Sequence, residues 1–130
     1  MIALDTNILL RYLVQDDPTQ AEAARWLIEE QLTPERPGYV AVTAVLELDW
    51  VLRSKFQLHE STVATLIVGL MQASALVFEH ADEIQEALRY THGDLADNIL
   101  HRVSRSNGCS HTVTFDKKFA RIDGVELLDG

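Results

Sequence analysis

The sequence predicts an α/β fold, a three-layer α/β/α sandwich around a central parallel sheet. Short apolar segments alternate with longer segments in which apolar residues recur at helical spacing, the pattern of βαβ units. The chain has 130 residues, of which 47% are hydrophobic, and this suits one domain with its own core. No linker or internal repeat interrupts the pattern, so we expect a single domain over residues 1–130.

The expected elements follow the apolar pattern in order. Each strand is short and bounded by polar residues or Gly, and each helix carries apolar residues at i, i+3 and i+4. Thr43 is expected to cap the third helix, and Gly93 with Asp94 to open the last one. The elements are strand 2–4, helices 8–14 and 19–31, strand 39–42, helices 43–55 and 60–74, strand 75–78, helix 81–91, a helix from 93 that ends before 107, strand 109–114 and edge strand 125–128.

Charge and composition limit the class of protein. With 20 Asp and Glu against 11 Lys and Arg, the net charge is −9, which disfavours a protein that binds nucleic acid mainly by neutralising phosphates. A nuclease whose carboxylates hold a divalent cation remains compatible with this charge. No apolar run approaches the ~20 residues of a membrane span, and no secretory signal precedes Asp5. Cys109 is the single cysteine, so we expect no disulfide and a cytoplasmic location, with Cys109 buried in its strand.

Four acidic residues lie where parallel strands end. Asp5 follows the first expected strand, and Asp116 follows the fourth. Glu47 lies early in the helix after the second strand, and Asp97 lies in the first turn of the helix before the fourth. Because ligands of open parallel sheets bind beyond the carboxyl ends of the strands, these acids are expected to share one site.

Helical spacing decides which further acids join them. Asp94 and Asp97 are three residues apart, about 60° around a helix, and share a face. Glu47 and Asp49 are about 200° apart, so only one of them faces the site. We choose Glu47, which is nearer the helix start, and expect Asp49 to be exposed. Asp94 alone has a simpler interpretation as a helix cap, and both roles stay open.

Gathered carboxylates repel one another, and their pKa values rise unless a cation neutralises them. Oxygen ligands suit Mg²⁺ or Mn²⁺, which orient water and stabilise charge on a phosphoryl oxygen. Several acids with no obligatory His or Cys ligand favour phosphodiester chemistry over a zinc site. Residue types and spacing alone leave this four-acid site and a set of unrelated caps and surface acids both open.

Four segments, residues 2–9, 45–53, 93–100 and 112–119, resemble in order the motif segments of PIN-domain nucleases, in particular the VapC toxins of bacterial toxin–antitoxin pairs. The resemblance spans nearly the whole chain. It implies Mg²⁺- or Mn²⁺-dependent endoribonuclease activity on RNA, neutralisation by an antitoxin protein, and a homodimer.

The same resemblance assigns site residues position by position. Asp5, Glu47, Asp97 and Asp116 match the acidic set that is catalytic and holds the metal, and Asp94 matches a position that is often acidic. Three polar residues match positions that support these carboxylates, Thr6, Asn7 and Thr114.

One departure concerns the helix after Asp97, where the family often has Ala in place of Leu100 and His101. His101 lies four residues after Asp97 on the same face. A contact with the site, the substrate or the antitoxin is open, and so is a His that is exposed or locally paired.

Other functions of related chemistry fit less well. A phosphoacceptor receiver domain needs an Asp after a central strand, where Glu79 and His80 follow Phe78. A haloacid-dehalogenase-type phosphatase needs a second acid two residues after its nucleophile, where Asn7 stands. A general RNA-processing PIN nuclease without an antitoxin and a non-catalytic PIN-fold binding module remain as alternatives.

Overall fold

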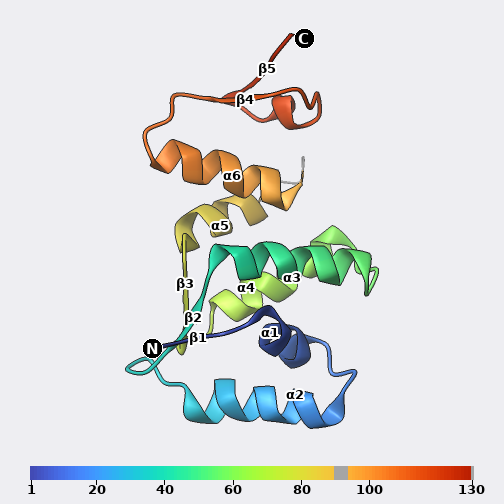
Figure 1. Ribbon diagram of the computed structural model, residues 1–130, viewed down its shortest axis with the longest axis vertical. Coiled ribbons are helices and arrows are strands. Elements are labelled where there is room, and N and C mark those ends of the chain that lie inside the picture. Colours follow the sequence, from blue (N-terminus) through green and yellow to red (C-terminus); the bar gives the residue numbers. More distant parts are fainter. Residues whose placement is uncertain (90–93, 130) are drawn as a thin grey trace. The chain divides into compact units, whose positions relative to one another are not determined.

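Helices alternate with parallel strands along the chain, which confirms the predicted α/β class (Figure 1). The computed structural model describes residues 1–89 and 94–129. The chain divides into two compact units, Met1–Ala81 and Asp82–Gly130. Gly93 and Thr91, the expected start and end of two helices, lie outside the described residues. Within the described residues, none of the helices has the length and apolarity to cross a bilayer.

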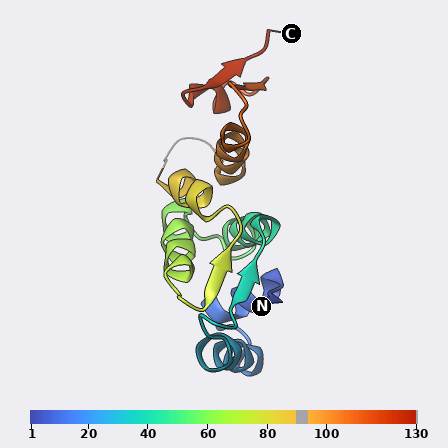
Figure 2. The same cartoon turned by 90° about the vertical axis from the view of Figure 1, so that its left-hand side faces the viewer.

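The first unit contains a three-stranded parallel sheet in the order β1-β2-β3. Tyr39 of the central strand pairs with Ala3 on one side and with Val77 on the other. Strands β2 and β3 run side by side in one direction (Figure 2). The elements of this unit are β1 (Ile2–Ala3), α1 (Thr6–Leu13), α2 (Pro18–Arg25), the π-helix η1 (Trp26–Gln31), β2 (Gly38–Val40), α3 (Val42–Ser54), α4 (Glu60–Met71) and β3 (Leu76–Phe78).

Apolar side chains from the sheet and from two helices form the core of the first unit. Val40 of β2, Leu48 and Leu52 of α3, and Ile67 of α4 have almost no exposed surface. Each such side chain contributes about 1.5–3 kcal/mol when it leaves water. This packing fixes α3 beside the ends of the strands, where the predicted acidic segment lies.

The start of α3 differs from the prediction. The helix begins at Val42, with Ala41 as the N-cap residue, rather than at a Thr43 cap. Ala41 has no side chain that accepts a hydrogen bond, so a remote group takes that role: Oε1 of Glu79 accepts from the Val42 backbone N–H at 2.8 Å. A helix can begin at a residue without a polar cap when tertiary structure supplies the missing acceptor.

The second unit contains a two-stranded parallel ribbon, in which Thr112 pairs with Val125. Phe119, Ile122 and Val125 form its small apolar cluster. The strand expected at 109–114 starts only at Thr112, and Cys109 is exposed rather than buried. The elements are α5 (Ala81–Leu88), α6 (Leu95–Ser106), β4 (Thr112–Thr114), the 3₁₀ helix η2 (Phe119–Arg121) and β5 (Val125–Leu127).

Candidate active site

Asp5 lies between β1 and α1, at the carboxyl end of the strand. Its Oδ1 accepts a hydrogen bond of 2.7 Å from the Thr6 backbone N–H, so Asp5 is the N-cap of α1. The Asp5 side chain is exposed, whereas Thr6 is buried. Asn7 is exposed and lines a pocket of about 470 Å³ between α1 and α2, together with Trp26. The segment therefore presents a carboxylate and an amide next to each other at the start of a helix.

Glu47 and Asp49 lie on different sides of α3, as predicted, but Asp49 is buried and not exposed. Glu47 is exposed, as the helical spacing relative to Asp49 allows. Asp49 is only 4% exposed, so its predicted exposure is wrong. Nε and Nη2 of Arg53 donate to its two carboxylate oxygens at 3.0 and 2.8 Å. The i, i+4 spacing of Asp49 and Arg53 in the sequence is the signal that would have identified this pair.

Glu79 is a strand-end carboxylate whose supporting role is indicated by no local pattern in the sequence. It follows β3, and its side chain accepts from the first backbone N–H of α3, 37 residues earlier in the chain. Burial raises the pKa of the Tyr39 hydroxyl, and the charge and hydrogen bonding of the Glu79 carboxylate raise it further. Glu79 thus ties α3, the helix that carries Glu47, to the end of the sheet.

Three predicted acids of the second unit interact electrostatically. Asp94 is the N-cap of α6 and accepts from the Ala96 backbone N–H at 2.9 Å, which is the simpler role foreseen for it. Asp97 lies in the first turn of the same helix and is half-buried. Its carboxyl pKa is raised above the ordinary 3.8 by burial first, and then by the charges of Asp94 and Asp116.

Asp116 follows β4 and is held by backbone and hydroxyl groups. The Thr114 hydroxyl oxygen accepts from the Asp116 backbone N–H at 3.0 Å. One carboxylate oxygen of Asp116 accepts from the backbone N–H groups of Lys118 and Phe119, at 2.9 and 3.3 Å. These bonds fix the exposed carboxylate at the turn before η2.

The acids of the second unit offer the oxygen ligands that a hard divalent cation binds. The charges of Asp94 and Asp116 raise the pKa of Asp97, and a cation that neutralised them would relieve this repulsion. Carboxylate oxygen is the ligand that Mg²⁺ and Mn²⁺ prefer. Among residues 1–89 and 94–129, no three His, Cys, Asp or Glu side chains are gathered closely enough to bind an ion as they stand. Asp94, Asp97 and Asp116 nevertheless fit a hard cation in ligand type and charge, since all three are carboxylates and Asp97 interacts with the other two.

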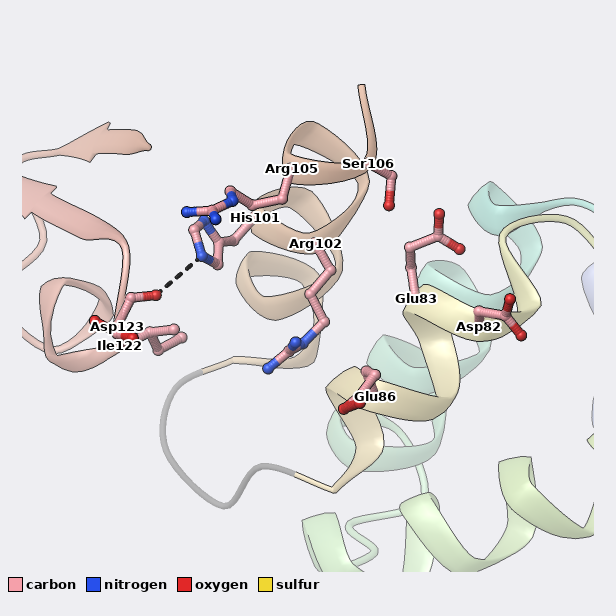
Figure 3. Close-up of a pocket in the computed structure, with 9 residues that line it drawn as sticks. All are labelled: Asp82, Glu83, Glu86, His101, Arg102, Arg105, Ser106, Ile122 and Asp123. Carbon is pink, nitrogen blue, oxygen red and sulfur yellow. Dashed lines mark hydrogen bonds between the residues drawn. The ribbon is translucent and has the colours of Figure 1, made fainter. Parts of the chain in front are cut away.

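His101 of α6 is buried and fully engaged, which resolves its open role in favour of a local pair. It is 5% exposed, and its Nδ1 lies 2.7 Å from the Thr112 hydroxyl. Its Nε2 lies 3.1 Å from the Asp123 carbonyl oxygen, the bond drawn in Figure 3. The ring borders a pocket of about 480 Å³ that Arg102 and Arg105 line from α6, and none of the predicted catalytic acids lines it.

Comparisons with known proteins place the chain in a family. The model of the PIN domain family matches residues 2–125, and the match takes in all five predicted acids. The comparison with curated proteins gives no match. PIN domains are generally Mg²⁺- or Mn²⁺-dependent nucleases that act on RNA, and their helices and parallel strands form a three-layer α/β/α fold.

Proposed function

Because the chain belongs to the PIN domain family, we propose that it is a metal-dependent endoribonuclease that acts as the toxin of a toxin–antitoxin pair. The observation that carries the nuclease is the complete acidic set of Asp5, Glu47, Asp97 and Asp116. A non-catalytic PIN-fold module would tolerate a neutral residue at one of these positions, and none has one. We take residues 1–130 as one catalytic domain, since the family match spans both units.

All of the proposed metal ligands are carboxylates. Asp5, Glu47 and Asp97 would do most of the binding of Mg²⁺ or Mn²⁺, and Asp116 would complete the site directly or through water. Asp94 would add a fifth carboxylate with the oxygen that does not cap α6. When bound, the cation activates a water and stabilises charge on a phosphoryl oxygen of the RNA.

Polar neighbours would orient these carboxylates. Thr114 accepts from the Asp116 backbone N–H, which fixes the turn that presents the acid. The Thr6 N–H donates to Asp5, so one oxygen of that carboxylate is oriented and the other points away from the bond. Asn7, next to them, would offer its amide to the substrate or to a metal-bound water.

Cleavage of an RNA by the purified chain, with and without Mg²⁺ or Mn²⁺, tests the nuclease. We expect cleavage only with the metal, and a loss of at least about 100-fold in Asp5→Asn, since a ligand contributes several kcal/mol of transition-state stabilisation. Glu35→Gln removes an exposed charge from a loop and serves as the matched control. Equal cleavage by the wild type and Asp5→Asn would exclude the enzyme.

The toxin role rests on the resemblance to VapC toxins. A basic segment of an antitoxin would complement a chain of net charge −9, and complementary charge speeds encounter. We also propose a homodimer in the cytoplasm as the acting form. A general RNA-processing PIN nuclease without an antitoxin is the second candidate, because the acidic set serves both equally.

Co-expression with the product of the neighbouring open reading frame separates these two candidates. For a toxin, induction of the wild type stops growth, co-expression restores it, and the two proteins purify together. If growth is neither arrested nor rescued and no complex forms, the toxin role is wrong while the nuclease stands. Asp5→Asn, which binds the partner without cleaving RNA, is the control for growth arrest by cleavage.

A further inference from the structure

His101 connects three segments of the second unit that are distant in sequence. It lies on α6, one helical turn after Asp97. Thr112, its first partner, begins β4, and Asp123, its second partner, precedes the turn into β5. The Thr112 backbone N–H also donates to the carbonyl of Gly124, the residue after Asp123, at 3.0 Å, so the segments of the two partners are joined to each other.

The chemistry of the partners assigns the protons on the ring. The Asp123 carbonyl oxygen only accepts, so Nε2 carries the proton and donates to it. Nδ1 is then the acceptor, and the Thr112 hydroxyl donates to it. Both nitrogens of a neutral imidazole are thereby satisfied in a buried position, which avoids the cost of an unpaired buried polar atom.

The turn before β5 approaches the His101 imidazole closely at Gly124. Gly124 has a φ of 88°, a conformation that side-chain-bearing residues rarely adopt. A Cβ at this position would stand 3.1 Å from Nε2 of His101, closer than packing normally allows. At this point α6 and the turn therefore pack too closely to admit a side chain at position 124 without a shift.

Two of the proposed metal ligands lie on the elements that His101 joins. Asp97 is on α6, one turn before His101, and Asp116 follows β4, the strand that Thr112 begins. We propose that His101 is a positioning residue that sets the separation of Asp97 from Asp116 by fixing α6 to β4 through Thr112. This inference rests on the proposed function only in assigning the two acids to one metal.

Thr112→Val tests the link with the smallest change of shape, because it removes one hydroxyl and keeps the volume. His101→Gln keeps a donor for the Asp123 carbonyl and loses the ring. Ser104→Ala is the matched control: it removes a hydroxyl of α6 that bonds only within that helix, to the Leu100 carbonyl at 2.7 Å. All three variants are first checked for cooperative unfolding.

Three readouts are then compared: Mn²⁺ affinity, kcat against KM for RNA cleavage, and amide hydrogen exchange of β4 and of α6. For Thr112→Val and His101→Gln we expect Mn²⁺ affinity to fall about 10-fold, the lower end for groups that orient ligands. We also expect kcat to fall more than KM changes, and exchange to quicken in β4 and α6 together. Ser104→Ala should stay within about twofold of the wild type, since its bond does not reach β4.

Two results have different meanings. If Thr112→Val and His101→Gln keep the wild-type affinity, kcat and exchange rates, His101 does not position these acids. If the wild type neither binds Mn²⁺ nor cleaves RNA, the proposed function is wrong, and the exchange rates alone decide the inference. Unchanged exchange in β4 and α6 then overturns it, and joint acceleration in both supports it.

Discussion

The helices α3 and α6 each carry one acid of the proposed site, but they are held in different ways. α3 buries Ala44, Val45, Leu48 and Leu52 together with Asp49, whose partner Arg53 lies on the same helix, and its first N–H is satisfied by the distant Glu79. α6 buries Ile99 beside two polar residues, Asn98 and His101, and is capped locally by Asp94. The hydrophobic effect has no preferred direction, whereas a hydrogen bond constrains both distance and angle. Substitutions in α3 should therefore mainly lower the free energy of unfolding, whereas substitutions in α6 should mainly change the positions of its acidic side chains.

The largest expected effect is on catalysis and comes from α6. Asp97→Asn should reduce metal-dependent RNA cleavage by at least about 100-fold, as expected for loss of a ligand. The free energy of unfolding in metal-free buffer should not fall, because the substitution removes a charge that Asp94 and Asp116 repel. Cleavage rates and urea unfolding measure the two effects. A variant that is as active as the wild type would contradict the role of Asp97.

The next effect is on stability and comes from α3. Leu48→Ala should lower the free energy of unfolding by about 2–5 kcal/mol, because it leaves a cavity at a site that is 1% exposed. Leu100→Ala makes the same change on α6, where the side chain is 51% exposed, and should cost within about 0.5 kcal/mol. Urea unfolding of both variants checks the contrast. Equal losses would mean that α6 depends on apolar packing as much as α3 does.

The sequence predicted the parts of the site that depend on local pattern. Asp5, Asp97 and Asp116 lie at the predicted ends of their elements, because strand ends and caps are set by neighbouring residues. It did not predict the contacts between residues that are distant in the sequence. The remote cap from Glu79 and the bonds of His101 to Thr112 and Asp123 join segments 11 to 37 residues apart, and no local pattern encodes them.

Asp49 and Cys109 show the same limit in burial. The helical spacing correctly places Asp49 and Glu47 on different sides of α3, but it does not say which side is covered by other elements. Asp49 can be buried because the charge of Arg53 compensates that of its carboxylate. Cys109 is exposed because β4 starts three residues later than its apolar pattern suggested. For Asp49 the i, i+4 spacing to Arg53 was the available signal, whereas the start of β4 depends on its pairing with β5, which no local pattern encodes.

A smaller effect should appear in the dependence of stability on pH. Burial, and then the charges of Arg105 and Arg102, lower the pKa of His101 below the ordinary 6.5, against hydrogen bonding and charge at Asp123 that raise it. The unfolded chain therefore takes up the proton more readily than the folded protein. The stability that His101 contributes is present above the unfolded pKa and is lost as the pH falls through the folded pKa.

Urea unfolding between about pH 8 and about pH 5 measures this loss. The wild type should lose more stability than His101→Gln over this interval, because Gln does not titrate. The carboxylates of α5 that line the same pocket are present in both proteins, so their contribution cancels in the difference. Parallel pH profiles for the two proteins would mean that the folded protein accepts a protonated His101 without cost.

The smallest effect concerns the remote cap of α3. Glu79→Ala should lower the free energy of unfolding by about 1 kcal/mol, the usual value of a lost helix cap, because the Val42 N–H loses its acceptor. Glu79→Gln keeps a carbonyl oxygen in reach and should cost less, so the pair separates the hydrogen bond from the charge. In both variants the pKa of Tyr39 should fall toward its ordinary 10, since the carboxylate charge is gone, and a spectrophotometric titration follows it. If Glu79→Ala lowers the Tyr39 pKa without changing stability, the start of α3 is held by its buried apolar face alone, and the contrast with α6 becomes sharper.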